Sequence, residues 1–131
     1  MFFKQVFCGD FVVGEQVESA GAAKVSFADW SKMDLRVGLM ELVEDVAGKD
    51  KLYKLSVDFG SAGKRVILAG LKPFYSKEEL QGKKSIFVFN LVPRTMAGFE
   101  SNGMILAARN NENKYKILFA DDSIQQGTKM E

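Results

Sequence analysis

The stretch NLVPRTMAGFESNGMILAA, from Asn90 to Ala108, decides how we interpret the fold of this 131-residue chain. Apolar runs with the β-branched and aromatic composition of strands occur at 85–89 and at 104–108. Between them, Pro93 has no backbone donor and two glycines favour turn conformations, so neither strand can continue. The remaining side chains include a guanidinium, a thioether and small hydrogen-bonding groups. We therefore expect a segment whose mixed surface could hold a splayed base or a phosphate.

The same stretch has a simpler interpretation as a β-hairpin. Asn102-Gly103 is the dipeptide most typical of a two-residue hairpin turn. Spacing alone favours this turn over a binding segment. The functional interpretation therefore depends on the rest of the chain.

The composition is that of one globular domain without catalytic machinery. Hydrophobic residues make up 47% and charged residues 27% of the chain, which is ordinary for such a domain. Because the chain has no histidine, it lacks the commonest general base, histidine-based zinc sites and Ser–His or Cys–His pairs. We expect no catalysis by this chain alone, no cofactor and no metal.

Location signals are absent from the sequence. No apolar run approaches the ~20 residues that cross a bilayer, and the N-terminus lacks the pattern of a signal peptide. The single cysteine excludes an internal disulfide and is compatible with a reducing compartment. These features predict a cytoplasmic protein without a membrane partner.

Alternation and turn residues predict an all-β fold with two short helices. Helix-capping patterns at Ser26 and Ser76 predict helices over 26–33 and 76–80. The order of the elements, with the second helix between strands three and four, is that of a five-stranded OB-fold barrel. The expected strands are 35–44, 53–59, 65–69, 84–91 and 104–109, with 115–119 as a final hairpin partner and a polar tail that wraps the outside.

Three details of this fold follow from single residues or segments. Gly38 inside the first strand predicts a bulge or a sharp bend that curls the sheet. Phe27 and Trp30 are expected in the core, because aromatic side chains mostly serve burial. Residues 1–25 form an N-terminal extension, with two short strands followed by a connector, that would dock on the barrel or at a dimer interface.

The stretch from Asn90 to Ala108 resembles the signature of the tRNA-binding domain family. Segments 34–38, 50–53 and 57–60 match the same family in order, so the resemblance covers residues 27–131. The match is closest to the C-terminal or β-subunit branch of methionyl-tRNA synthetase. The resemblance implies that residues 26–131 form an OB-fold domain, that the chain is a homodimer, and that the synthetase catalytic chain is a possible partner.

The resemblance also implies a function and a set of site residues. The chain would be a non-catalytic module that binds tRNA by its shape and backbone and raises the affinity of a synthetase for its substrate. The implied contacts are to phosphates from Lys51, Arg65 and Arg94, hydrogen bonds from Asn90, Ser101 and Asn102, and apolar contacts or packing from Met96 and Met104.

The charge distribution gives this function only partial support. The net charge is +1, which is low for a protein that binds nucleic acid. Residues 61–94 contain seven bases and two acids, and one face could therefore be positive. Thr95 and Ala97 stand where the family commonly has basic residues. Binding would then be weakened or rebuilt around a secondary basic rim of Lys64, Lys72, Lys83 and Lys84.

Other functions stay open at this point. A related bacterial member is an export-linked chaperone that binds unfolded peptide, and an apolar groove with little salt sensitivity would favour that role. A pure dimerisation module is a second alternative. No feature of the sequence supports a third, an extracellular cytokine-like role.

Overall fold

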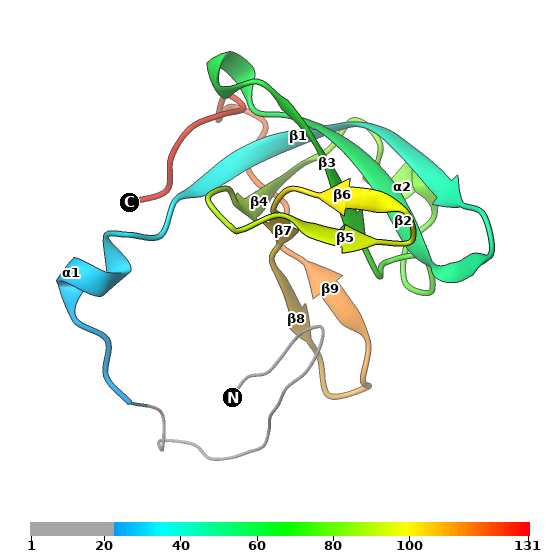
Figure 1. The fold of residues 1–131 in the computed structure, drawn as a ribbon, viewed down its shortest axis with the longest axis horizontal. Coiled ribbons are helices and arrows are strands. Elements are labelled where there is room, and N and C mark those ends of the chain that lie inside the picture. Colours follow the sequence, from blue (N-terminus) through cyan, green and yellow to red (C-terminus); the bar gives the residue numbers. More distant parts are fainter. Residues whose placement is uncertain (1–22) are drawn as a thin grey trace. The chain divides into compact units, whose positions relative to one another are not determined.

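The computed structural model of the chain describes residues 23–131, and residues Met33–Glu131 form a compact unit (Figure 1). The strands expected within residues 2–14, and most of the connector expected after them, lie outside the described residues. The domain boundary expected between residues 25 and 26 stays a prediction.

The fold is mostly β, as the sequence predicts. One sheet has the strand order β3-β2-β1-β4-β7, and β5–β6 and β8–β9 form two separate two-stranded ribbons. Neighbouring strands are antiparallel throughout these sheets. The elements are α1 (Phe27–Trp30), β1 (Leu35–Val46), β2 (Lys49–Asp58), η2 (Gly60–Ala62), β3 (Lys64–Ala69), α2 (Lys77–Leu80), β4 (Lys84–Val88), β5 (Arg94–Met96), β6 (Phe99–Ser101), β7 (Met104–Ile105), β8 (Ala107–Arg109) and β9 (Tyr115–Ile117).

Strand β1 curls the sheet by changing partners along its length. Its first part pairs with β4 and its second part with β2, and Leu39 is the residue that both pairings share. A Cβ atom at Gly38 would lie 2.5 Å from Val57 Cγ1 and 2.8 Å from Phe59 Cε1. Glycine is therefore required at this point because two core side chains occupy the space of any larger residue.

The alternation expected along 35–44 is wrong for this strand. The pairing with β2 shifts register between Met40 and Leu42, two residues after Gly38, so Met40 and Val43 both point into the core. A β-bulge adds a residue to one strand and moves the following side chains to the other face. The alternation of apolar and polar residues in the sequence does not reveal where such a register shift occurs.

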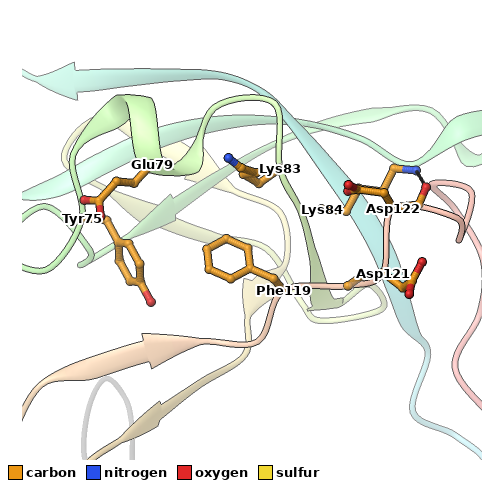
Figure 2. Close-up of a pocket in the computed structure, with 8 residues that line it drawn as sticks. Tyr75, Glu79, Lys83, Lys84, Phe119, Asp121 and Asp122 are labelled. Atoms are coloured by element: carbon orange, nitrogen blue, oxygen red, sulfur yellow. Dashed lines mark hydrogen bonds between the residues drawn. The ribbon is translucent and has the colours of Figure 1, made fainter.

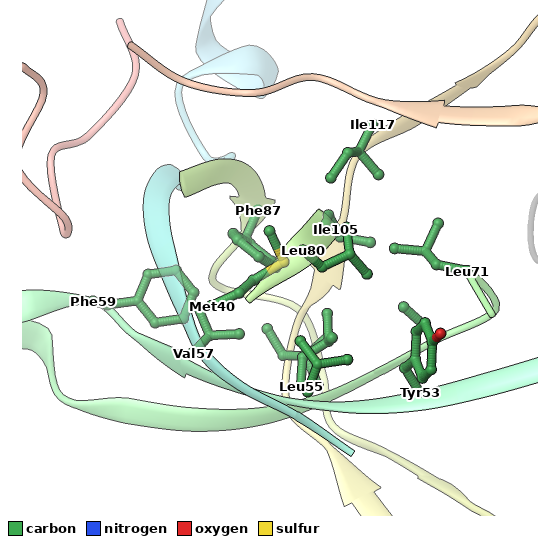
Figure 3. Close-up of a cluster of buried hydrophobic side chains, with 13 residues drawn as sticks. Met40, Tyr53, Leu55, Val57, Phe59, Leu71, Leu80, Phe87, Ile105 and Ile117 are labelled. Atoms are coloured by element: carbon green, nitrogen blue, oxygen red, sulfur yellow. The ribbon is translucent and has the colours of Figure 1, made fainter. Parts of the chain in front are cut away.

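Strand β2 confirms its expected alternation and provides much of the core (Figure 3). Tyr53 is 4% exposed, and Leu55, Val57 and Phe59 are fully buried. Burial of each such side chain contributes about 1.5–3 kcal/mol to stability. The core also contains Met40, Val43, Ile67, Ala69, Leu71, Leu80, Phe87, Ile105 and Ile117.

Helix α2 begins with the capping box that the sequence predicts. Glu79 N donates to Ser76 Oγ at 3.2 Å, and Ser76 N donates to Glu79 Oε1 at 2.8 Å. Leu80 is fully buried, and Gly82, with a φ of 85°, follows the end of the helix. No helix among residues 23–131 is long and apolar enough to span a bilayer.

Helix α1 has its expected cap but a different length and a different role. Asp29 N donates to Ser26 Oγ at 3.1 Å, yet the helix ends at Trp30 instead of Met33. Phe27 is 80% and Trp30 46% exposed, so the prediction that both lie in the core is wrong. A single helical turn is too short to give the expected apolar side, and the helix has no buried residue.

The stretch around Pro93 contains a hairpin, but its turn is not at Asn102-Gly103. Strands β5 and β6 pair across Ala97 and Gly98, whose φ angles are 51° and 82°. Positive φ at both central residues is the requirement of a type I′ hairpin turn. The strand expected over 84–91 ends at Val88, before this hairpin.

After the β5–β6 hairpin, β7 joins the five-stranded sheet, and β8 then belongs to a separate ribbon. The run expected as one strand over 104–109 is divided into β7, which pairs with β4, and β8, which pairs with β9. The polar tail lies against the outside of the sheet, as expected. Gly127 N donates to Val37 O at 2.7 Å, and Met130 N donates to Leu35 O at 2.7 Å.

Candidate nucleic-acid interface

The two edge strands of the curled sheet, β3 and β7, approach each other, and β6 of the β5–β6 hairpin also contacts β3. Figure 1 labels these strands. Leu68 N, on edge strand β3, donates to Ser101 Oγ at 3.0 Å, and Asn102 N donates to Val66 O at 2.9 Å. These bonds fix the hairpin alongside β3 and lead the chain into β7 at the other edge. We call the resulting surface the hairpin rim, which comprises Arg65, Phe89, Asn90 and residues 94–104.

Gly103 allows the chain between β6 and β7 to pass close to Ile67 of β3 and Val88 of β4. Its φ is 133°, and a Cβ atom there would lie 3.0 Å from both Ile67 Cδ1 and Val88 O. The Asn-Gly pair therefore serves the junction between β6 and β7 and not the hairpin turn itself. This is the physical reason why the simple hairpin interpretation misplaced the turn.

Ser101 and Asn102 have structural contacts at the rim. Ser101 is 5% exposed, and its hydroxyl oxygen already accepts the bond from Leu68 N. Asn102 is half-buried and uses its backbone N–H to bond β3. Their predicted hydrogen bonds to RNA stay predictions, and the geometry gives both residues a role in positioning the hairpin.

Arg94 is the exposed cation of the hairpin. Its Cα lies opposite Ser101, the residue that anchors β6 to β3. Among the described residues, no acidic side chain pairs with Arg94. A guanidinium in this position can give both nitrogen edges to a phosphate without first breaking an ion pair.

The two predicted methionines lie on either side of this hairpin. Met96 is half-buried and stands opposite Phe99 across the turn. Met104 is exposed at the start of β7, opposite Val88. Met104 therefore offers apolar surface at the rim, and Met96 offers less of it.

Asn90 joins two of the segments that carry the family resemblance. Its Oδ1 accepts a hydrogen bond of 2.9 Å from Asp34 N, and Phe89 N donates to Asp34 O at 2.7 Å. The end of β4 is thereby tied to the beginning of β1. The side-chain oxygen of Asn90 thus bonds the hairpin rim to the backbone before β1.

Arg65 is held at the rim by Phe89. Its guanidinium carbon lies 3.5 Å from the centroid of the Phe89 ring, and Nη1 donates to the carbonyl oxygen of Phe89. Arg36 contacts the same ring at 4.7 Å and forms a two-pronged ion pair with Asp34, at 2.9 and 3.2 Å. The sequence pattern did not indicate Phe89 as a site residue, although it directly precedes Asn90.

The basic side chains between residues 61 and 94 do not form one positive face. Lys64 lies at the end of β3 that pairs with Asp58, whereas Lys72 N bonds to Lys51 O near the other end of β2. Lys51 is exposed there, next to the turn between β1 and β2. The expectation of a single basic surface is therefore not met, because the strand order carries these lysines to different ends of the sheet.

Several of these lysines already have partners. Lys64 Nζ lies 3.1 Å from Glu41, and Asp45 pairs with Lys77 at 2.7 Å and with Lys72 at 2.9 Å. The hydrogen bonds from Lys77 and then Lys72 lower the pKa of Asp45, and the bond to Asp45 raises the pKa of Lys77. Solvent screens such exposed ion pairs, so a phosphate can still compete for these lysines.

Lys83 and Lys84 line an open pocket between α2 and the C-terminal tail (Figure 2). The pocket has a volume of about 510 Å³ and is also lined by Tyr75, Glu79, Phe119, Ala120, Asp121 and Asp122. Lys84 Nζ donates to the carbonyl oxygens of Asp122 and Ile124, at 3.0 and 2.7 Å. Three carboxyl groups around two lysines make this pocket a poor site for a phosphate.

Comparison with known proteins identifies the family. Residues 35–129 match the sequence profile described as the putative tRNA binding domain. The methionine–tRNA ligase of Pyrococcus horikoshii is 41% identical over 121 residues, which cover 92% of this chain but 16% of that protein. The chain therefore spans a small part of the length of the curated relatives it matches.

Solved structures show the same relationship. The chain resembles a MetRS-related protein of Pyrococcus horikoshii, with a TM-score of 0.79 and 33% identity over 83% of this chain and 99% of that one. It also resembles the chaperone CsaA of Bacillus anthracis, with a TM-score of 0.75 and 28% identity over 83% of this chain and 100% of that one. This chain belongs to the putative tRNA-binding domain family.

Proposed function

We propose that this chain is a non-catalytic module that binds tRNA, acting as or alongside the β part of methionyl-tRNA synthetase. Two kinds of similarity support this proposal, one to methionine–tRNA ligases and one to a MetRS-related protein. The chain matches only a small share of the ligases, so it would supply affinity for tRNA and not the ligase chemistry. A tethered module of this kind raises the effective concentration of tRNA at a synthetase.

The hairpin rim is the observation that carries the proposal. It places Arg65 of β3 against Phe89, which directly precedes Asn90, and it leaves Arg94 exposed on a hairpin that is bonded to the same strand β3. Arg65 and Arg94 would contact phosphates, with Lys51 as a third contact at the turn between β1 and β2. Recognition of this kind follows the shape of folded RNA more than its sequence.

A titration with total tRNA at two salt concentrations tests the proposal. Three phosphate contacts give a slope of about −2 to −3 in a plot of log affinity against log salt. Between 50 and 200 mM salt the affinity should then fall by about 15- to 60-fold, measured by fluorescence anisotropy. Absence of binding to tRNA at the lower salt concentration would reject the function.

Peptide binding is a second candidate, favoured by the similarity to CsaA proteins described as chaperones. Val92, Phe99 and Met104 are exposed apolar side chains at or beside the hairpin rim. Binding of an unfolded apolar peptide, with little change between the two salt concentrations and with no tRNA binding, would favour this function. Competition between peptide and tRNA would place both ligands on the same surface.

A homodimer and the synthetase catalytic chain are proposed partners, and the cytoplasm is the proposed location. Leu118 and Phe119 are exposed apolar residues that directly follow β9, and they offer a surface for a second copy of the chain. Sedimentation equilibrium at micromolar concentration should give twice the monomer mass. A dimer that binds neither tRNA nor peptide would favour a pure dimerisation module.

A further inference from the structure

We propose that Phe89 is a positioning residue for RNA binding, whose ring holds the guanidinium of Arg65 in place for a backbone phosphate. This inference rests on the proposed tRNA-binding function. It assigns one contact to Arg65 and makes that contact depend on an aromatic side chain that need not touch RNA itself.

Phe89 is itself held firmly by the fold. Its ring packs edge-on against the ring of Phe59, with centroids 4.9 Å apart and an interplanar angle of 73°. Phe59 is fully buried in the core, and the backbone N–H of Phe89 is bonded to Asp34. The ring is therefore a fixed platform that extends from the core to the hairpin rim.

The cluster around this ring contains two cations and one anion. Arg36 is neutralised by Asp34 and also donates to Gly127 O at 3.4 Å. Arg65 has no acidic partner among the described residues. The cluster thus keeps one unbalanced positive charge, and that charge belongs to the guanidinium nearest the ring.

Arg65 keeps enough donors to bind an anion. A guanidinium has five N–H donors, and Nη1 of Arg65 bonds to Phe89 O. The remaining donors carry no recorded partner among residues 23–131. Because the residue is half-buried, a phosphate beside it would be less screened than one beside a fully exposed lysine.

The stacking explains why Phe89 matters for affinity. A free arginine loses side-chain entropy when it is immobilised by a ligand, whereas a guanidinium already stacked on a ring loses less. Arg65 is also adjacent to Val66, which accepts the bond from the hairpin at Asn102. A fixed Arg65 and the exposed Arg94 would therefore hold the RNA backbone from two sides of the junction between β3 and the hairpin.

Substitution Phe89→Leu tests the role of the ring, because leucine keeps an apolar side chain but cannot stack a guanidinium. We expect the affinity for total tRNA to fall about five- to tenfold, as after Arg65→Gln. The slope of log affinity against log salt should become shallower by about 0.7–0.9, the loss of one phosphate contact. The double variant should lose little more than either single variant, because both changes remove the same contact.

Two matched variants separate positioning from packing. Phe89→Tyr keeps the aromatic face and should keep the wild-type affinity and salt slope. Phe74→Leu removes a half-buried ring that packs on Tyr115, outside the hairpin rim, and should leave both quantities unchanged. Circular dichroism gives the folded fraction of each variant.

The results distinguish this inference from the proposed function. If the wild-type chain binds tRNA and folded Phe89→Leu keeps the full salt slope, the positioning role is wrong and the function stands. If the wild-type chain does not bind tRNA, both are wrong. If Phe89→Leu does not fold, Arg65→Lys decides, since lysine keeps the charge without a planar group: a clear loss of affinity supports the role of the ring, and wild-type affinity overturns it.

Discussion

Replacement of Arg94 by alanine is the most direct test of the hairpin rim. Arg94 is exposed, and no acidic side chain pairs with it among the described residues, so its removal breaks no recorded ion pair. The backbone pairing of β5 with β6 does not need the side chain. The free energy of unfolding should therefore stay within about 0.5 kcal/mol of the wild-type value.

The expected loss of binding follows from the kind of contact. A charge-assisted hydrogen bond is worth about 1.5–3 kcal/mol, and an exposed ion pair is worth about 1 kcal/mol or less. For an exposed guanidinium on a phosphate we expect about 1–2 kcal/mol, which is about a five- to 30-fold loss of affinity. The salt slope should also become shallower by about 0.7–0.9.

The assay is fluorescence anisotropy with total tRNA at 50 and 200 mM salt, together with thermal unfolding of each variant. Arg109→Ala is the matched control, because it removes the same charge from an exposed strand of the separate β8–β9 ribbon. Equal binding by the Arg94 and Arg109 variants would refute the interface. A large drop in the melting temperature of Arg94→Ala would instead make Arg94 a structural residue.

Four further predictions concern stability and charge. Gly38→Ala should destabilise the fold by about 1–3 kcal/mol in urea unfolding, because its Cβ would overlap core side chains; a wild-type midpoint would contradict the close packing of Val57 and Phe59 around Gly38. Ala97→Asn should stabilise the chain by about 0.5–1 kcal/mol, since asparagine adopts the positive φ of this turn more easily; a lower melting temperature would count against a type I′ turn. Ser101→Ala should cost about 1–3 kcal/mol by leaving a buried N–H without its acceptor, and full stability would show that this bond is dispensable. Because the pKa of Asp45 is lowered in the folded protein, its ion pairs stabilise the fold above the ordinary pKa of the carboxyl, and this contribution is lost as the pH falls through the lowered value. Lys77→Met should raise the pKa of Asp45 toward its ordinary value in an NMR titration, and an unchanged pKa would contradict the pairing.

The candidate site was only partly predictable. The sequence signature located the rim and its exposed cation, Arg94. It did not separate residues that face solvent from Ser101, whose hydroxyl oxygen bonds the backbone of β3. It also missed Phe89, because a ring that holds an arginine from another strand has the same local pattern as any strand phenylalanine.

The amino-acid sequence by itself determined the features that depend on near neighbours. These are the buried alternation of β2, the capping box of α2 and the order of the first four strands, with α2 between β3 and β4. Each rests on the preferences of residues a few positions apart, which are present before the chain folds.

Only the tertiary structure decided which distant segments meet. The register shift in β1, the bonds from Ser101 and Asn102 to β3, and the stacking of Arg65 on Phe89 all join residues far apart in the chain. The same is true of the lysines that pair with Glu41 and Asp45 instead of forming one basic face. Such contacts depend on how the curled sheet brings its strands together, and no local pattern of residues specifies them.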